Sequence, residues 1–486
     1  MAPLLLLLPL LFAGRAASAD EPYRPRFHFS PDRNWTNDPN GTVFYRGEYH
    51  LFYQYNPFGD TWGHMSWGHA VSRDLIRWEH LPVALAEENG IMIFSGSAVV
   101  DEHNSSGFCS KPGGSCLVAI YTGHTQTRQT QNLAYSNDRG RTWTKYASNP
   151  VIDPGMKDFR DPKVFWHDPS KRWVMVVALP RDHKVRFYAS PDLKQWTALS
   201  DFGPAGATGG QWECPDIFPL AIAGERETRW VLSVNLNPGA PQGGSGNQYF
   251  AGQFDGATFV NDNPAGVELW ADYGKDFYAS TSFSGIPARD GRRIWLAWFS
   301  NWQYARLEPT SPFRGIQTVP RELALKRTAQ GLRLQQLPVR ELNRLRRRVV
   351  ALRDVNVAEA NRALAGFHGK SYEVEVDAAA DLLVRAGANE QTRVGIDREK
   401  KSVFIDRGRS GQTGFHPAFS GAHRAPIDGM DSPLRVLVDA SSVEVFADAG
   451  VASISDRIFP SEGSDGLRLA GPDQARVRLL RVWRLE

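Results

Sequence analysis

Three acidic residues of this 486-residue chain share one local pattern, an acid close to a proline and followed by an apolar, aromatic segment. They are Asp38, Asp161 and Glu213; the first two directly precede a proline, and the third stands two residues before one. Two carboxyl groups facing each other across a glycosidic bond suffice to hydrolyse it, provided that one is ionised and the other protonated. The three acids are therefore candidates for the catalytic groups of a glycosidase.

The neighbours of these acids predict different roles for them. Asp38 follows Asn37 in a segment of turn composition, whose amides would donate to a carboxylate and keep it ionised as a nucleophile. Glu213 lies between Trp212 and Cys214, a drier setting that would retain a proton for the leaving oxygen.

Asp161 directly follows Arg160, and this pair is better suited to holding sugar hydroxyls than to transferring protons. Taken singly, each motif also has a structural explanation: an aspartate in a turn, an ion pair at the start of a strand, and a half-buried glutamate beside an indole. Their occurrence at matching places of a repeat favours the chemical interpretation.

The repeat consists of an apolar strand, a Ser-x-Asp turn and a later tryptophan. Clear copies have their turns at Ser72, Ser136 and Ser190, and a fainter one has Asp255 and Phe259. The period of about 60 residues is long enough for a four-stranded antiparallel sheet, which predicts the blades of a β-propeller.

A second series of residues opens these units, each followed by a short aromatic or β-branched strand. Its members are Asp38, Ser95, Asp161, Glu213 and Tyr278. If the opening strand of each blade is the innermost one, equivalent positions face one axis. The periodicity therefore predicts an acidic pocket at one mouth of the central channel.

The pattern changes after residue 335. We expect a propeller domain over residues 20–335, a basic linker or short helix over 336–350, and a second β domain over 351–486. Alternating apolar and polar residues predict sandwich strands in the second domain. The predicted strands are 372–377, 392–397, 402–407, 434–439, 442–447, 467–470 and 477–483. We find no catalytic constellation there.

Composition restricts the ligand. The formal charge of +3 is the difference between 56 basic and 53 acidic residues, which gives no reason to expect nucleic acid or an anionic membrane as partner. Fifteen tryptophans suit clefts that bind the apolar faces of sugars, although core packing explains most of them equally well.

The first 19 residues have the composition of a signal peptide, which predicts an extracellular or periplasmic protein with no membrane segment after its removal. Cys109 and Cys116 flank a Gly/Pro-rich loop and are able to form a disulfide in an oxidising compartment, leaving Cys214 unpaired. Three free thiols are the alternative.

Five motifs together resemble glycoside hydrolase family 32, in their order and spacing over nearly the whole chain. They are Trp35-Thr36-Asn37-Asp38-Pro39-Asn40-Gly41, Gln54-Tyr55-Asn56-Pro57, Phe94-Ser95-Gly96-Ser97, Arg160-Asp161-Pro162 and Trp212-Glu213-Cys214-Pro215. The resemblance implies an all-β architecture, a five-bladed β-propeller followed by a C-terminal β-sandwich. It also implies a retaining β-fructosidase that needs no metal or organic cofactor.

By position, Asp38 resembles the family's nucleophile, Glu213 its acid/base and Asp161 its transition-state stabiliser. Seven further residues fall where the family contacts sugar: Asn37, Gln54, Trp62, Phe94, Ser95, Arg160 and Trp302. His64 and His69 lack a ligand set with zinc spacing and are expected to pack or to form hydrogen bonds instead.

The substrate follows from the resemblance only as a class. The segments 90–100 and 131–153 look more like microbial exo-levanases and exo-inulinases than plant invertases, so release of terminal fructose from levan or inulin, and from sucrose, is expected. The alternatives are a fructosyltransferase of the same family, a fructan-binding propeller without turnover, and a related propeller glycosidase acting on arabinose or xylose polymers.

Overall fold

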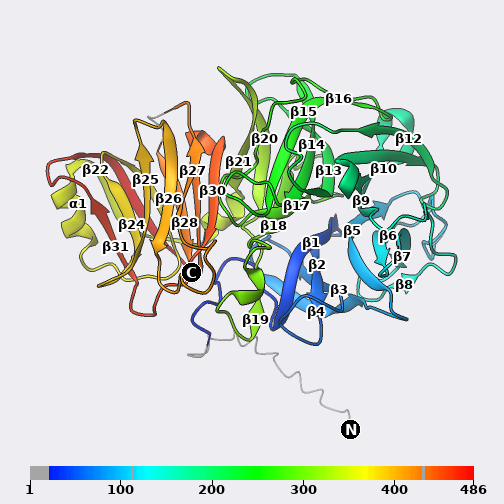
Figure 1. Ribbon diagram of the computed structural model, residues 1–486, viewed down its shortest axis with the longest axis horizontal. Coiled ribbons are helices and arrows are strands. Elements are labelled where there is room, and N and C mark those ends of the chain that lie inside the picture. The colour runs from blue at the N-terminus through cyan, green and yellow to red at the C-terminus, as the bar shows by residue number, and fades with distance from the viewer. Residues whose placement is uncertain (1–20, 112, 430–432) are drawn as a thin grey trace, which may run out of the picture.

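The protein consists of two all-β bodies that lie side by side, a propeller and a sandwich (Figure 1). The structure is a computed structural model that describes residues 21–111, 113–429 and 433–486. The predicted signal peptide, residues 1–19, lies outside the described residues.

The propeller has five blades, each an antiparallel sheet of four strands arranged in chain order. Blade 1 contains β1 (Asn34–Tyr45), β2 (Glu48–Asn56), β3 (Ser66–Ser72) and β4 (Trp78–Leu85), with β19 (Phe313–Arg314) added parallel to β1. Blade 2 contains β5 (Met92–Asp101), β6 (Cys116–His124), β7 (Gln129–Ser136) and β8 (Thr144–Lys145). Blade 3 contains β9 (Arg160–His167), β10 (Arg172–Leu179), β11 (Lys184–Ser190) and β12 (Thr197–Phe202). Blade 4 contains β13 (Gln211–Ala221), β14 (Thr228–Asn237), β15 (Gly246–Phe254) and β16 (Phe259–Asn261). Blade 5 contains β17 (Tyr278–Ser282), β18 (Arg293–Trp298), β20 (Arg321–Thr328) and β21 (Gly331–Pro338). Short 3-10 helices are η1 (Asp168–Ser170), η2 (Pro180–Asp182) and η3 (Ala305–Leu307).

The first strand of every blade lies innermost. Strands β1, β5, β9, β13 and β17 contact one another in a ring, β1 with β5, β5 with β9, β9 with β13, and β13 and β1 with β17. The predicted propeller, with the opening strand of each blade facing the axis, is therefore confirmed.

The Ser-x-Asp repeats form the turns between the third and fourth strands of the blades. The carboxylates of Asp74, Asp138 and Asp192 accept backbone N–H groups two to four residues ahead, which closes the turn. Asp255 does the same in blade 4. Asx-type hydrogen bonding explains why an aspartate recurs at equivalent places of these turns.

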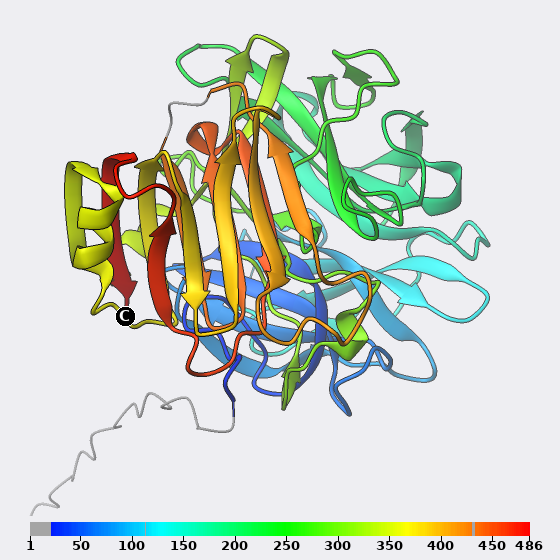
Figure 2. The same cartoon turned by 60° about the vertical axis from the view of Figure 1, so that its left-hand side comes forward.

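The sandwich packs one six-stranded sheet against one five-stranded sheet (Figure 2). The first sheet has the order β22 (Arg346–Asn356), β32 (Arg476–Leu485), β23 (Tyr372–Ala378), β28 (Leu434–Asp439), β29 (Ser442–Ala447) and β30 (Ala452–Arg457). The second has the order β27 (Ala422–Pro426), β26 (Ser402–Arg409), β25 (Gln391–Asp397), β24 (Asp381–Ala386) and β31 (Gly466–Ala470). The 3-10 helices η4 (Arg340–Leu345) and η5 (Asp448–Gly450) flank these strands. Alternate residues such as Val374, Val384 and Val436 fill the core between the sheets.

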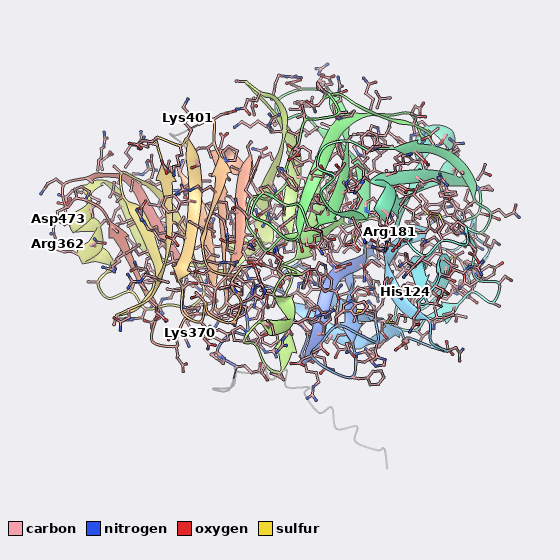
Figure 3. The ribbon with its side chains drawn as sticks, in the orientation of Figure 1. His124, Arg181, Arg362, Lys370, Lys401 and Asp473 are labelled. Carbon is pink, nitrogen blue, oxygen red and sulfur yellow. A yellow bond between two sulfur atoms is a disulfide. The ribbon has the colours of Figure 1, made fainter. Side chains whose placement is uncertain are left out.

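Several features of this half differ from the expected strand list. Strands β22, β24, β27 and β30 were not in it, and β22 occupies part of the expected linker as an edge strand. The helix α1 (Val357–Leu364) begins at a capping box formed by Asn356 and Glu359, with N to O distances of 2.9 and 3.1 Å. Arg362 of this helix marks the outer end of the sandwich, far from His124 of the propeller (Figure 3).

Cys109 and Cys116 form a disulfide, which settles the alternative in favour of the bridge. Cys214 remains a free thiol. Within the described part of the chain, no helix has the length and apolar character needed to cross a membrane.

A buried ionic cluster joins the propeller to the sandwich. The ring nitrogens of His28 lie 2.9 Å from Asp439 and 2.8 Å from Glu444, and Arg321 binds Glu444 at 2.6 Å and Asp272 at 2.9 Å. All five side chains are fully buried. Because both imidazole nitrogens face carboxylates, the ring is held in its doubly protonated, charged form.

Burial alone would lower the pKa of His28, but its hydrogen bonds to Asp439 and Glu444 outweigh that effect and raise the pKa. Against the effect of burial, His28 and Ser371 hold the pKa of Asp439 below its usual range, and Arg321 and His28 do the same for Glu444. Removing the cation would leave two buried carboxylates short of a partner, which is strongly destabilising.

We predict that His28→Gln lowers the free energy of unfolding by about 3 kcal/mol at pH 6. Because the pKa of His28 is higher in the folded than in the unfolded protein, the charged imidazole stabilises the fold. This stabilisation is complete below the pKa of an unfolded histidine, about 6.5, and is lost as the pH rises through the pKa of His28 in the folded protein. The difference between wild type and variant is therefore expected to narrow as the pH rises above about 6.5, as measured by denaturant unfolding of the full chain.

His368→Gln is the matched control, since His368 binds Asp465 at 2.8 Å but is 68% exposed. It is expected to cost less than about 1 kcal/mol. A difference for His28→Gln that is constant or grows with pH would contradict the assigned charge of the imidazole.

Candidate active site

The five inner strands carry the predicted site residues at one end of the central channel. Asp38 lies in β1, Ser95 in β5, Asp161 in β9, Glu213 in β13 and Tyr278 in β17. The second sequence series is thus one ring of residues, and every member lines the same pocket.

A β-bulge marks each of these positions. The register shifts between Thr36 and Pro39 in β1, between Phe94 and Gly96 in β5, and beside Arg160 in β9. It shifts again between residues 213 and 216 in β13 and between 278 and 281 in β17. An extra residue in a strand re-aims the next side chain, so bulges turn these groups towards the channel mouth.

The backbone at three bulges has left-handed torsion angles. φ is +67° at Asp161, +44° at Cys214 and +54° at Ala279. Such conformations cost on the order of 1 kcal/mol or more for residues with a side chain and persist where surrounding structure fixes them. Left-handed backbone therefore occurs at three of the five bulges that form the pocket.

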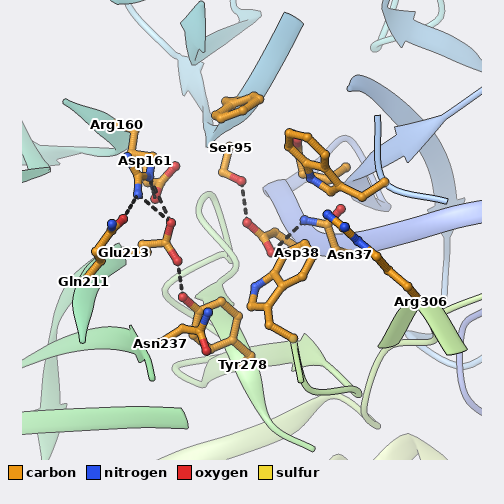
Figure 4. Close-up of a pocket in the computed structure, with 14 residues that line it drawn as sticks. Asn37, Asp38, Ser95, Arg160, Asp161, Gln211, Glu213, Asn237, Tyr278 and Arg306 are labelled. Atoms are coloured by element: carbon orange, nitrogen blue, oxygen red, sulfur yellow. Dashed lines mark hydrogen bonds and ion pairs between the residues drawn. The ribbon is translucent and has the colours of Figure 1, made fainter. Parts of the chain in front are cut away.

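The pocket has a volume of about 290 Å³ (Figure 4). Its lining comprises Asn37, Asp38, Gln54, Trp62, Phe94, Ser95, Arg160, Asp161, Gln211, Glu213, Asn237, Tyr278, Trp302 and Arg306. All ten residues proposed from the sequence are in this set, and the structure brings them together; their individual roles stay predictions. Gln211, Asn237 and Arg306 were missed, because no motif marks them in the sequence.

Asp38 is nearly buried, with 9% of its surface exposed, and accepts hydrogen bonds from three side chains. Ser95 Oγ donates to Oδ2 at 2.7 Å, Asn37 Nδ2 donates to Oδ1 at 3.0 Å, and Cys214 Sγ lies 3.5 Å from Oδ2. Burial raises the pKa of Asp38, and these donors partly counteract the rise.

Glu213 lies on another wall of the pocket, where Arg160 and Tyr278 hold it (Figure 4). Arg160 Nε and Nη2 lie 2.9 and 2.8 Å from Oε1, and the Tyr278 hydroxyl donates to Oε2. Arg160 also donates to Gln211 at 2.7 Å and to Asp158 at 3.0 Å. The guanidinium therefore fixes the direction in which Glu213 points.

Asp161 and Cys214 lie between these two walls. Asp161 is 6% exposed, and its Oδ2 accepts the Cys214 backbone N–H at 2.9 Å, with the thiol sulfur 3.6 Å away. Burial raises the pKa of Asp161 to about 7; Arg160 acts against this rise, whereas Glu213 and Asp38 add to it. Burial likewise raises the pKa of the Cys214 thiol, which is thus a neutral donor to both aspartates.

Two expectations about local environment are wrong. The segment from Asn37 to Gly41 is part of strand β1 and not a turn, so side chains and not turn amides solvate Asp38. Trp212 points away from Glu213 into the core of blade 4, where Nε1 donates to Ala207 O at 2.9 Å. Neighbouring residues of a strand face opposite sides, so the indole does not make the glutamate's setting dry.

Aromatic rings form the remaining wall. Trp302 stacks on Trp35 at 5.9 Å between ring centroids, and Phe94 stacks on His124 at 4.1 Å while its edge meets Trp62. A pocket with apolar ring faces on one side and convergent polar groups on the other suits a sugar, which has both kinds of surface.

No cluster of three or more His, Cys, Asp or Glu residues with metal-binding geometry occurs among the described residues. His69 lies buried against His50, with 3.1 Å between ring nitrogens, whereas His64 binds Glu87 at 2.7 Å. The two histidines that are close in sequence therefore have separate, structural partners.

The chain matches two domain descriptions of one family. Residues 28–338 match the Glycosyl hydrolases family 32 N-terminal domain, and residues 341–484 match the Glycosyl hydrolases family 32 C terminal. A levanase of Bacillus subtilis is 50% identical, over 96% of this chain and 71% of its own length. An extracellular exo-inulinase of Aspergillus niger is 40% identical, over 93% of both chains. The crystal structure of an exo-inulinase from Aspergillus awamori superposes with a TM-score of 0.89 at 37% identity, covering 96% of this chain and 99% of the other.

We predict that Ser95→Ala raises the pKa of Asp38 by about one unit. The hydroxyl donates to the carboxylate and so stabilises its ionised form, and one hydrogen bond to a charged group is worth about 1.5 kcal/mol or more. The measurement is a ¹³C NMR titration of carboxyl-labelled aspartate, with the Asp38 signal assigned from its absence in Asp38→Asn.

Ser97→Ala is the matched control, because Ser97 lies two residues further along β5 and accepts the Val164 N–H at 3.0 Å without touching Asp38. It should leave the titration midpoint of Asp38 in place. If the pKa of Asp38 shifted equally in both variants, or did not shift in Ser95→Ala, Ser95 would not be the principal hydrogen-bond donor to Asp38.

Proposed function

The chain belongs to glycosyl hydrolases family 32, and we propose that it is an exo-acting β-fructosidase that releases terminal fructose from levan or inulin and from sucrose. The observation that carries the proposal is the convergence of Asp38, Asp161 and Glu213 in a pocket with aromatic walls. The levanase and exo-inulinase relatives, by their names, act on fructans.

Action at the chain end follows from the depth of the pocket. Beneath its floor, the channel narrows to a cavity of about 20 Å³ bounded by Asp161, Cys214 and Lys163. That is room for about one water molecule and not for a second sugar. A fructan chain is therefore able to insert one terminal unit but not to thread through the site, so single fructose units are released.

Catalysis proceeds in two steps. In the first, an Asp38 oxygen attacks the anomeric carbon of the fructosyl unit, the bond to the leaving oxygen breaks, and Glu213 gives that oxygen a proton. In the second, Glu213 takes a proton from water, whose oxygen attacks the same carbon and releases Asp38. Two displacements retain the configuration and regenerate both carboxyl groups.

The remaining polar groups position the reactants. Asp161 faces the space between the two catalytic carboxyls and is placed to bind fructosyl hydroxyls, whereas Arg160 keeps Glu213 directed at the leaving oxygen. Arg160 also offsets part of the negative charge of Glu213, Asp161 and Asp158.

We further propose that the protein is secreted. The Cys109–Cys116 disulfide requires an oxidising compartment, and the exo-inulinase relative is described as extracellular. The leader composition of residues 1–19 supports the same proposal.

We predict that the purified chain, incubated separately with levan, inulin, sucrose and arabinan, releases fructose from the fructosides alone and forms no intermediate oligosaccharides. Asp38→Asn and Glu213→Gln should each lower kcat by 10³-fold or more, because each removes a group required in the transition state. Chromatography of the products over time provides the measurement.

Asp192→Asn, a change in a turn at the blade rim, is the matched control and should retain wild-type turnover. Fructose-containing oligosaccharides longer than the substrate would instead identify a transferase that shares the first step. Binding of fructan without any product, or release of arabinose, would overturn the β-fructosidase proposal.

A further inference from the structure

A second cavity, of about 530 Å³, lies at the opposite end of the propeller's channel. The same inner strands line both sites. In β5, Phe94 and Ser95 face the catalytic pocket, whereas Val99 and Val100 face the second cavity. Ser95 and Val99 are four residues apart in an extended strand, which places them about 13 Å from each other.

Strands β9 and β13 repeat this arrangement. Arg160 and Glu213 belong to the catalytic pocket, whereas Phe165 and Ile217 line the second cavity. Lys163 lies between them and borders both the narrow cavity of about 20 Å³ and the larger one. The second cavity is therefore a separate site and not an extension of the fructosyl pocket.

Four aromatic side chains, Phe165, Trp166, Trp173 and Trp230, contribute to the wall of the second cavity. Trp166 is 37% exposed, and its ring centroid lies 5.3 Å from that of Trp173. Trp230 lies 5.7 Å from Phe165, again between centroids, and Pro219 completes the apolar lining. A pocket of this size and composition resembles small-molecule sites, which are mostly apolar with a few polar anchors.

The polar anchor is Arg293, the first residue of β18. Its guanidinium packs 5.2 Å from the Phe218 ring and has one hydrogen bond, from Nη1 to Phe283 O at 3.3 Å. Within the described residues, no carboxylate oxygen comes within 4.0 Å of it. Burial lowers the pKa of Arg293, and Asp216 is the anion that acts against this effect.

That anion is already engaged. Asp216 Oδ2 lies 3.0 Å from Lys163 Nζ and accepts the Ser282 N–H at 2.6 Å. Lys163 also donates to Ser282. One carboxylate thus faces two cations, Lys163 and Arg293, which leaves an excess positive charge at the inner end of the cavity.

The other titratable groups of the lining do not remove this excess. Glu102 and Asp168 are exposed at its edge, and Asp168 binds Lys171. His167 hydrogen-bonds to Ser170 at 2.7 Å, and burial lowers its pKa, so it is neutral. The Arg293 side chain is only partly buried and makes one hydrogen bond, so its other N–H groups remain able to bind an anion that enters the cavity.

We propose that this cavity binds a small organic anion with an apolar, preferably aromatic, body, whose carboxylate pairs with Arg293 while its ring packs among Trp166, Trp173 and Trp230. The site is independent of fructoside cleavage. It contains no group that the catalytic mechanism uses.

The test is isothermal titration calorimetry of the full chain with 2-naphthoate, alongside its neutral analogue 2-naphthylmethanol. Wild type should bind one naphthoate per chain and should bind the alcohol at least tenfold more weakly. Arg293→Met should weaken naphthoate binding tenfold or more, because a charge-assisted hydrogen bond is lost, whereas Arg293→Lys should retain most of the affinity. A saturating concentration of fructose should not displace the naphthoate.

Arg226→Met removes the same charge from an exposed position on the propeller and is the matched control, with unchanged affinity expected. Failure of naphthoate to saturate any site, or displacement by fructose, would overturn the proposal. Equal binding of acid and alcohol by wild type would also overturn it, whether or not Arg293→Met folds.

Discussion

The crowding of three carboxyl groups in one pocket, with the Arg160 guanidinium beside two of them, is the constraint on which this structure depends. Burial raises the pKa values of Asp38 and Asp161, and electrostatic repulsion from Glu213 adds to both rises. Arg160 opposes the repulsion only because further hydrogen bonds, including those to Gln211 and Asp158, fix its position. The pKa of Asp161 is about 7, so this carboxyl is partly protonated at neutral pH, whereas Ser95 and Asn37 donate hydrogen bonds to Asp38 and favour its charged form.

The propeller supplies the rigidity that such a cluster needs. Five inner strands converge on one axis, and each has a bulge at the residue that enters the pocket. Left-handed torsion angles at Asp161, Cys214 and Ala279 are tolerated because blades on both sides fix the backbone. The sandwich adds a buried ionic contact through His28, which does not line the pocket, so its effect on catalysis is through the stability of the scaffold.

Much of this was predictable from the sequence, because a propeller repeats its local signals. The Ser-x-Asp turns and the opening residues of the blades follow from periodicity, and that periodicity alone places Asp38, Asp161 and Glu213 around one axis. What could not be predicted depends on bulges. Whether Trp212 or Glu213 faces the channel is decided by one extra residue in β13, which leaves no mark in a hydrophobic pattern.

The same reasoning explains the other differences. Gln211, Asn237 and Arg306 reach the pocket from strand ends and from η3, where no repeat signals a role. The edge strand β22 is rich in arginine and lacks the alternation of a half-buried strand, so its sequence resembles a linker. Pairing with β32 makes it a strand, and such long-range pairing is invisible to local patterns.

The central claim is that Asp38 forms a covalent bond to fructose. It is tested most directly by mixing Glu213→Ala with 4-nitrophenyl β-fructofuranoside, quenching the reaction rapidly and analysing the protein by mass spectrometry. Nitrophenolate leaves without a proton, so the first step does not need Glu213. The second step does need a general base, so the covalent intermediate should accumulate in this variant. The account predicts that a peptide containing Asp38 gains the mass of one fructosyl unit. Nitrophenol release with no modified peptide, or with the fructosyl unit on Asp161, would contradict it.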